Sequence, residues 1–208
     1  MSKKKSLITC SLVGFFGSLF FIYCFPKGAI TTLMHEVFHL PGPGAGIALI
    51  LGPFVIFLGL LSVKISGSYG APTICIATFS IAYSIIVNIM SLPVEGKGKF
   101  GSLGFVFALV LCGIILDIFF YLLKKIKPVM QLILTSSIAN IVLLVFYWLV
   151  IFPQTKGLVN AKDVPILLGV CILGASLVGL ITIPVSNFIL PIFRLNNEEG
   201  VSDHVRNP

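Results

Sequence analysis

The residues best able to do chemistry lie in one short run, His35-Glu36-Val37-Phe38-His39. On a helix, residues four apart share a face, so His35 and His39 could bind one zinc ion while Glu36 activates a zinc-bound water as the catalytic base. This H-E-x-x-H pattern is the sharpest motif in the chain. Under one interpretation it predicts a zinc cofactor and a zinc-dependent intramembrane metalloprotease.

A catalytic zinc ion also needs a third protein ligand, and the chain offers Asp117 or Glu95. Asp117 lies inside an apolar run and is expected roughly 20 Å from the outer end of its helix, too far from the histidines. Glu95, in a predicted outer loop, is the better candidate. A Pro-Gly turn over 41–46 follows His39 and stops any helix there. These features favour a protein that is not an enzyme.

Two other interpretations of the same run need no catalysis. The histidines and Glu36 could simply solvate an external loop. Alternatively, a loop that carries His, Glu, Phe and a rigid Pro-Gly turn above a helical bundle is suited to close over a captured solute. The second interpretation predicts His35, Glu36 and His39 as solute-binding residues.

The elements that position these residues follow from composition. Hydrophobic residues make up 57% of the 208, charged residues only 10%, and the mean hydropathy is +1.10, so the chain needs lipid as its solvent. The five cysteines are scattered singly, which excludes a disulfide framework and a thiolate metal site. The net charge of +7 comes from residues at the ends of apolar runs rather than from a nucleic-acid-binding face.

The predicted fold class is therefore all-α, a polytopic integral membrane protein with a six-helix bundle. About 20 apolar residues are needed to cross a bilayer as a helix, where the backbone satisfies its own hydrogen bonds. The runs that meet this requirement are 7–25, 45–65, 72–92, 102–123, 129–152 and 165–192. They form one domain, 1–195, followed by a polar cytoplasmic tail, 196–208. The last run is long enough to tilt or to break near Pro184.

An even number of spans places both termini on one side, and the positive-inside rule predicts which side. The N-terminal side carries Lys3, Lys4, Lys5, Lys64, Lys124, Lys125, Lys127, Arg194 and Arg206, whereas the other side carries Lys27, Lys97, Lys99, Lys156 and Lys162. We therefore expect a multi-pass protein of the cell membrane with both termini cytoplasmic. The outer loops are then 26–44, 93–101 and 153–164.

Polar and aromatic residues inside the spans are costly in lipid and are therefore candidates for function. The third run contributes Tyr83 and Asn88, and the fifth contributes Asn140, Tyr147 and Trp148. Trp148 could stack on a solute or belong to an interfacial aromatic belt, and Asn140 could bind a ligand or bridge two helices. Asp117 is expected to accept a hydrogen bond from a neighbouring helix or to pair with a lysine near its own helix end.

The order of features along the chain resembles the substrate-binding S components of energy-coupling factor (ECF) transporters. The similar segments are 46–53, 67–71, 112–117 and 136–140. The resemblance implies a six-helix subunit with cytoplasmic termini, whose first external loop closes over a small solute, either a vitamin-like molecule or a metal ion. No Walker A sequence is present, so transport driven by ATP would need separate ATPase subunits.

Small residues recur at four-residue spacing in the first run, at Cys10, Gly14 and Ser18, and form a stripe that permits close helix packing in lipid. The resemblance implies that this stripe docks on a transmembrane coupling subunit, whereas packing inside the bundle is the alternative. The leading prediction is thus a solute-binding subunit of a transporter. A zinc metalloprotease and a structural or assembly subunit without ligand are the alternatives.

Overall fold

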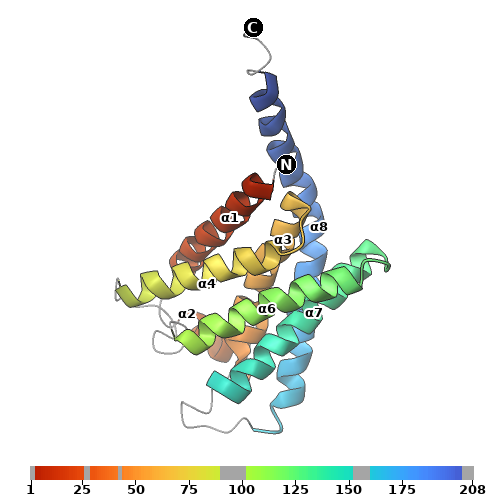
Figure 1. The fold of residues 1–208 in the computed structure, drawn as a ribbon. Helices are drawn as coiled ribbons and strands as arrows, with labels where there is room; N and C mark the ends of the chain where they lie inside the picture. The colour runs from red at the N-terminus through yellow and green to blue at the C-terminus, as the bar shows by residue number, and fades with distance from the viewer. Residues whose placement is uncertain (1–2, 26–28, 42–43, 90–101, 152–159, 203–208) are drawn as a thin grey trace.

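The computed structural model describes residues 3–25, 29–41, 44–89, 102–151 and 160–202. Every regular element in these ranges is a helix (Figure 1). In chain order the elements are α1 (Lys3–Cys24), α2 (Ala29–Thr32), the π-helical turns η1 (Leu33–Val37) and η2 (Ile47–Leu51), α3 (Gly52–Ser66), α4 (Ala71–Ile89), α6 (Leu103–Leu122), α7 (Pro128–Phe146), the π-helical turn η3 (Tyr147–Ile151) and α8 (Val164–Ser202).

Six helical segments of the described chain are long and apolar enough to cross a membrane, which confirms the predicted fold class. They are Lys5–Cys24, Ile47–Ser66, Ala71–Ile89, Leu103–Leu122, Pro128–Val150 and Val164–Ile189. Each segment begins within two residues of the first residue of the run that predicted it. Helix α8 passes through Pro184 and Pro191 without ending and continues to Ser202, so the first polar residues after 195 extend this helix.

Close backbone approach at glycines holds the helices together. A Cβ atom at Gly14 of α1 would lie 2.1 Å from the carbonyl oxygen of Cys75 in α4, so only glycine allows α1 to lie this close to α4. A Cβ atom at Gly113 of α6 would likewise lie 2.9 Å from the Cα atom of Thr73. Lipid supplies no hydrophobic force between helices, and small residues allow the tight packing that replaces it.

The described positive charges divide between the two ends of the bundle. One end holds the start of α1, the turn between α3 and α4, and the turn between α6 and α7 (Figure 1). We call it the basic end, because the described lysines there are Lys3, Lys4, Lys5, Lys64, Lys124, Lys125 and Lys127. The opposite end, which we call the His-Glu end, carries residues 29–41 and 44–46 and, among the described lysines, only Lys162.

Candidate functional site

The segment that carries the H-E-x-x-H pattern is attached to the bundle by two apolar side chains. Ile30 of α2 is 5% exposed and Met34 of η1 is 1% exposed, and both belong to the hydrophobic core. A Cβ atom at Gly46 would lie 2.5 Å from Cγ2 of Ile30, so the start of the second span packs directly on α2. The segment therefore packs on the His-Glu end of the bundle.

The polar residues of the pattern face away from the bundle. His35, Glu36 and His39 are all exposed. Nδ1 of His35 hydrogen-bonds the carbonyl oxygen of Leu40 at 2.8 Å, and Nδ1 of His39 hydrogen-bonds the carbonyl oxygen of His35 at 3.3 Å. A carbonyl oxygen only accepts, so each Nδ1 carries the proton, and in the neutral ring Nε2 keeps its lone pair. With this tautomer, both Nε2 atoms can coordinate a metal ion.

The turn ends in an uncommon backbone conformation. His39 has a φ of 51°, in the left-handed region, where histidine is tolerated better than most side chains. The N–H groups of Phe38 and Leu40 donate to the carbonyl oxygens of Leu33 and Met34, at 3.1 and 2.9 Å. The π-helical turn therefore ends at Val37, and the chain has left the helix by His39, as the Pro-Gly sequence that follows predicts.

The described residues include no group of three His, Cys, Asp or Glu side chains that could hold a metal ion. The structure places Asp117 with α4 rather than beside His35 and His39. Glu95, the other candidate third ligand, lies outside the described residues. At this segment the described chain therefore offers a metal ion two ligand atoms, the Nε2 atoms of His35 and His39.

Asp117 of α6 binds the start of α4. Its Oδ1 accepts a hydrogen bond from the Gly70 N–H at 2.8 Å, and its Oδ2 accepts from the Thr73 N–H at 3.2 Å and from the Thr73 hydroxyl. The first N–H groups of a helix lack partners within it and favour negative charge, so this carboxylate caps α4 from a neighbouring helix. The expected hydrogen bond from another helix is confirmed.

Asn140 of α7 joins three elements in the middle of the bundle. Its Nδ2 donates to the carbonyl oxygens of Ala48 in η2, at 2.9 Å, and Cys171 in α8, at 3.0 Å. In a π-helical turn the Ala48 carbonyl would accept from residue 53, but Pro53 has no N–H, so Asn140 supplies the missing donor. The side chain is 0% exposed and bridges helices, as one of its two predicted roles requires.

Tyr83 and Asn88 do not point into a common space. Tyr83 is 2% exposed and stacks on Phe79, with ring centroids 6.0 Å apart and planes at 12°, while its ring edge meets Phe21. Asn88 is exposed and its Nδ2 donates to the Ser84 hydroxyl at 3.3 Å. Tyr83 is therefore part of an aromatic core between α1, α3 and α4.

Tyr147 and Trp148, at the end of the fifth span, lie against Gly44. Gly44 has a φ of 101°, and a Cβ atom there would lie 3.0 Å from Nε1 of Trp148 and 3.5 Å from Cδ1 of Tyr147. Glycine thus lets the backbone at position 44 lie directly on this aromatic pair. The sequence alone contained no signal for this contact, since the partners are about a hundred residues apart.

The stripe of small residues on α1 lies inside the bundle. Cys10 is 1% and Ser18 is 0% exposed, and Gly14 touches the backbone of α4. This placement agrees with internal packing, the alternative to docking on a partner. The opposite face of α1 is apolar and exposed, with Phe16 and Phe20 at 61% and 58%.

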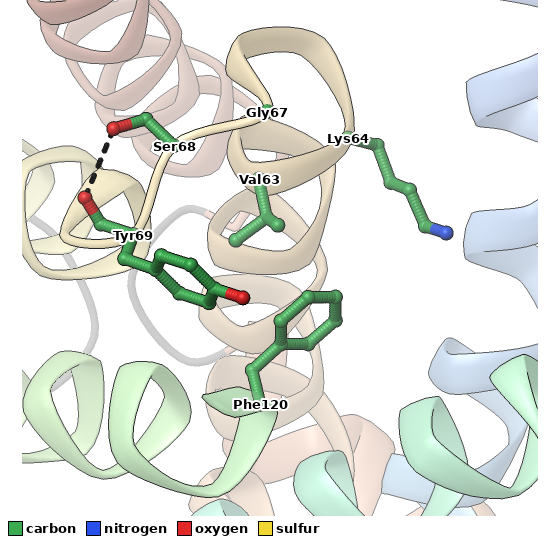
Figure 2. Close-up of a pocket in the computed structure, with 6 residues that line it drawn as sticks. All are labelled: Val63, Lys64, Gly67, Ser68, Tyr69 and Phe120. Atoms are coloured by element: carbon green, nitrogen blue, oxygen red, sulfur yellow. Dashed lines mark hydrogen bonds between the residues drawn. The ribbon is translucent and has the colours of Figure 1, made fainter. Parts of the chain in front are cut away.

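Two cavities at the basic end were not predicted from the sequence. One, of about 290 Å³, is lined by Val63, Lys64, Gly67, Ser68, Tyr69 and Phe120 (Figure 2). The other, of about 400 Å³, is lined by Tyr69, Asp117, Ile118, Tyr121 and Leu122. Tyr69 lines both cavities and lies two residues after Gly67, which caps the C-terminus of α3 in the left-handed conformation. A glycine after an apolar run is a sequence signal for a helix end, so the turn itself could have been predicted.

Comparisons of this chain with protein-family models, with curated proteins and with solved structures found no match.

Proposed function

We propose that this protein is a membrane-embedded solute-binding subunit of a transporter, which captures a small vitamin-like molecule or metal ion beneath the segment that residues 29–41 and 44–46 form. The observation that supports the proposal best is the contact of this segment with the bundle. Ile30 and Met34 attach it at one side, and Gly44 rests on Trp148 at the other. A segment held at two points, with an aromatic pair beneath it, has the form of a cover.

The groups around this cover suit small-molecule recognition. The indole and phenol rings of Trp148 and Tyr147 can stack on a planar solute, and ligand pockets combine such apolar walls with a few polar groups. His35 and His39 add two imidazoles with defined donor and acceptor atoms. Tyr83, Asn88 and Asn140 have structural or outward-facing positions, so we assign recognition to the residues near Trp148.

The distribution of lysines supports an orientation. The basic end carries seven described lysines against one at the His-Glu end, and loops rich in Lys and Arg remain cytoplasmic. We therefore propose that both termini are cytoplasmic in the cell membrane and that the cover faces outward. Release to the inner side would need partners, a transmembrane coupling subunit and ATPases. The exposed apolar face of α1 is the surface we propose for such a partner.

The experiment is to purify the protein in detergent, extract it and identify any bound small molecule by mass spectrometry, with zinc measured in the same sample. A stoichiometric organic solute in the wild type, depleted in Trp148→Ala but retained in Asn88→Ala, supports capture beneath the cover. Asn88 is the matched control because it is polar, exposed and remote in sequence from the cover. Absence of both a solute and zinc would contradict the proposal.

The free Nε2 atoms of His35 and His39 favour one alternative, a zinc-dependent hydrolase with Glu36 as base. The same sample distinguishes it. Stoichiometric zinc that is lost in His39→Ala, without an organic solute, and peptide hydrolysis that is abolished by Glu36→Gln, would replace the transport proposal with the hydrolase. Zinc that is bound without hydrolysis would instead identify a metal ion as the solute.

A further inference from the structure

The polar contacts that join the helices differ in how readily they can open. Asn140 is 0% exposed, so opening its two hydrogen bonds to backbone carbonyls would leave buried polar groups without partners. Gly70, Thr73 and Asp117 are each partly exposed and lie beside the exposed turn 67–69 at the basic end. Water at this end can replace lost partners, so the Asp117 contact opens at a lower cost than the Asn140 contact.

Packing around the Asp117 contact is also loose. The cavities of about 290 and 400 Å³ both border Tyr69, the residue before Gly70, and Asp117 itself lines the larger one. Gly67 and Gly70 have φ values of 63° and 87°, and a Cβ atom at either position would meet nothing within 4 Å. The turn from α3 to α4 therefore has room to move. Regions with few packed neighbours are the ones that open first in a folded protein.

Helices α1 and α4 are packed so closely that they form one unit. A Cβ atom at Gly14 would lie 2.1 Å from the carbonyl oxygen of Cys75, so the two backbones are in contact. Further along, the ring of Phe21 in α1 meets the rings of Phe79 and Tyr83 in α4, with centroids 6.1 and 6.0 Å apart. Any movement of α4 must therefore carry α1 with it.

Helices α6, α7 and α8 form a second unit, which hydrogen bonds hold together. Nε2 of Gln131 in α7 donates to the Phe120 carbonyl oxygen in α6 at 2.6 Å, and the Ser136 hydroxyl in α7 donates to the Ala175 carbonyl oxygen in α8 at 2.8 Å. Helices α4 and α6 lie side by side (Figure 1), so the border between the two units runs between them. Asp117 supplies hydrogen bonds across this border.

We infer that Asp117 is a latch, a releasable contact that holds the basic end of the bundle closed. When its carboxylate releases Gly70 and Thr73, α1 and α4 swing together away from α6. The ring of Phe54 in α3 packs on Phe21 and Phe79, with centroids 5.3 and 6.0 Å apart, and keeps the helices together nearer the His-Glu end.

The connection between α3 and α4 can follow this movement, because Gly67 and Gly70 tolerate large changes of φ. The latch is a property of the bundle alone. It depends neither on the proposed solute nor on the proposed orientation in the membrane, so its test can fail while the proposed function stands, and the reverse.

The test measures the separation of α1 from α6 at each end of the bundle, by pulsed electron paramagnetic resonance between two spin labels. One pair of labelled cysteines replaces Leu7 and Lys125 at the basic end, and the other pair replaces Tyr23 and Leu103 at the opposite end. All four positions are exposed. Cys24→Ser removes the exposed native cysteine, and the other native cysteines are buried.

Asp117→Asn keeps the shape of the side chain but replaces one acceptor oxygen with a donor group, so it cannot accept from both N–H groups. We expect the population with the longer Leu7–Lys125 distance to rise about tenfold over the wild type, the factor that corresponds to the loss of one charge-assisted hydrogen bond. The Tyr23–Leu103 distance should stay unchanged.

Thr73→Val is a milder variant, which removes the hydroxyl hydrogen bond to Asp117 and keeps the size of the side chain. It should raise the same population about threefold. Ser136→Ala is the matched control, because it removes a hydrogen bond between helices inside the second unit. It should leave both distances as they are in the wild type.

Unchanged Leu7–Lys125 distances in both Asp117→Asn and Thr73→Val would overturn the inference. Equal broadening at the two ends, or the same broadening in Ser136→Ala, would also overturn it, because either result would indicate a general loss of packing instead of a latch. Circular dichroism verifies that each variant is folded, and Thr73→Val decides the outcome if Asp117→Asn is not.

Discussion

The two ends of the bundle use polar groups in opposite ways. At the basic end, Asp117 bonds to residues 44 and 47 positions away in the sequence and fixes the start of α4 to α6. At the His-Glu end, the imidazoles bond only to carbonyls four and five positions away, and the polar side chains stay exposed. These polar groups therefore join helices at one end and remain accessible at the other, as the proposed capture at the His-Glu end requires.

The largest expected effect contrasts two helical glycines, Gly14 in the middle of α1 and Gly169 near the start of α8. Gly14→Ala places a Cβ atom where the Cys75 carbonyl oxygen now lies, so α1 must move away from α4. Overpacking of this kind typically costs about 1–3 kcal/mol, and we expect the upper part of that range. In Gly169→Ala, nothing lies within 4 Å of the added methyl group, and stability should be unchanged or slightly higher. Thermal unfolding in detergent measures both, and equal effects would contradict the close packing of α1.

The next effect contrasts the two acids. Asp117→Ala removes the partner of the Gly70 and Thr73 N–H groups and should lower the free energy of unfolding by about 1–3 kcal/mol. Glu36→Ala, at an exposed position, should change it by less than about 0.5 kcal/mol. Denaturant titration in mixed micelles compares them. A Glu36→Ala protein as unstable as Asp117→Ala would show that the His-Glu end also has a structural role.

The smallest effect contrasts the two histidines and has opposite signs. His39 has a positive φ, so His39→Gly relieves strain and should raise the unfolding free energy by about 0.5–1 kcal/mol. His35 lies within η1, and His35→Gly should lower it by about 0.5–1 kcal/mol. The same titration measures both, and a destabilising His39→Gly would mean that the His39 ring contributes more than its backbone costs.

The sequence predicted the spans closely because hydropathy is a local property that each run carries independently. It could not identify the partners of Asp117 or Asn140, since these depend on which helices pack together. Pro53 was a usable local signal, because a proline at the start of a span leaves a carbonyl one turn earlier in need of a donor. The contact of Gly44 with Trp148 had no such signal, and neither did the cavities beside Tyr69.

The central claim, capture of a solute beneath residues 29–41 and 44–46, is tested most directly by the fluorescence of Trp148, the only tryptophan in the chain. The compound identified in the purified protein would be removed and then titrated back. Because Trp148 lies directly under Gly44, saturable binding should shift or quench its emission, and the same titration of Lys64→Gln should be unchanged. A compound that binds stoichiometrically while leaving Trp148 emission constant would contradict capture at this place.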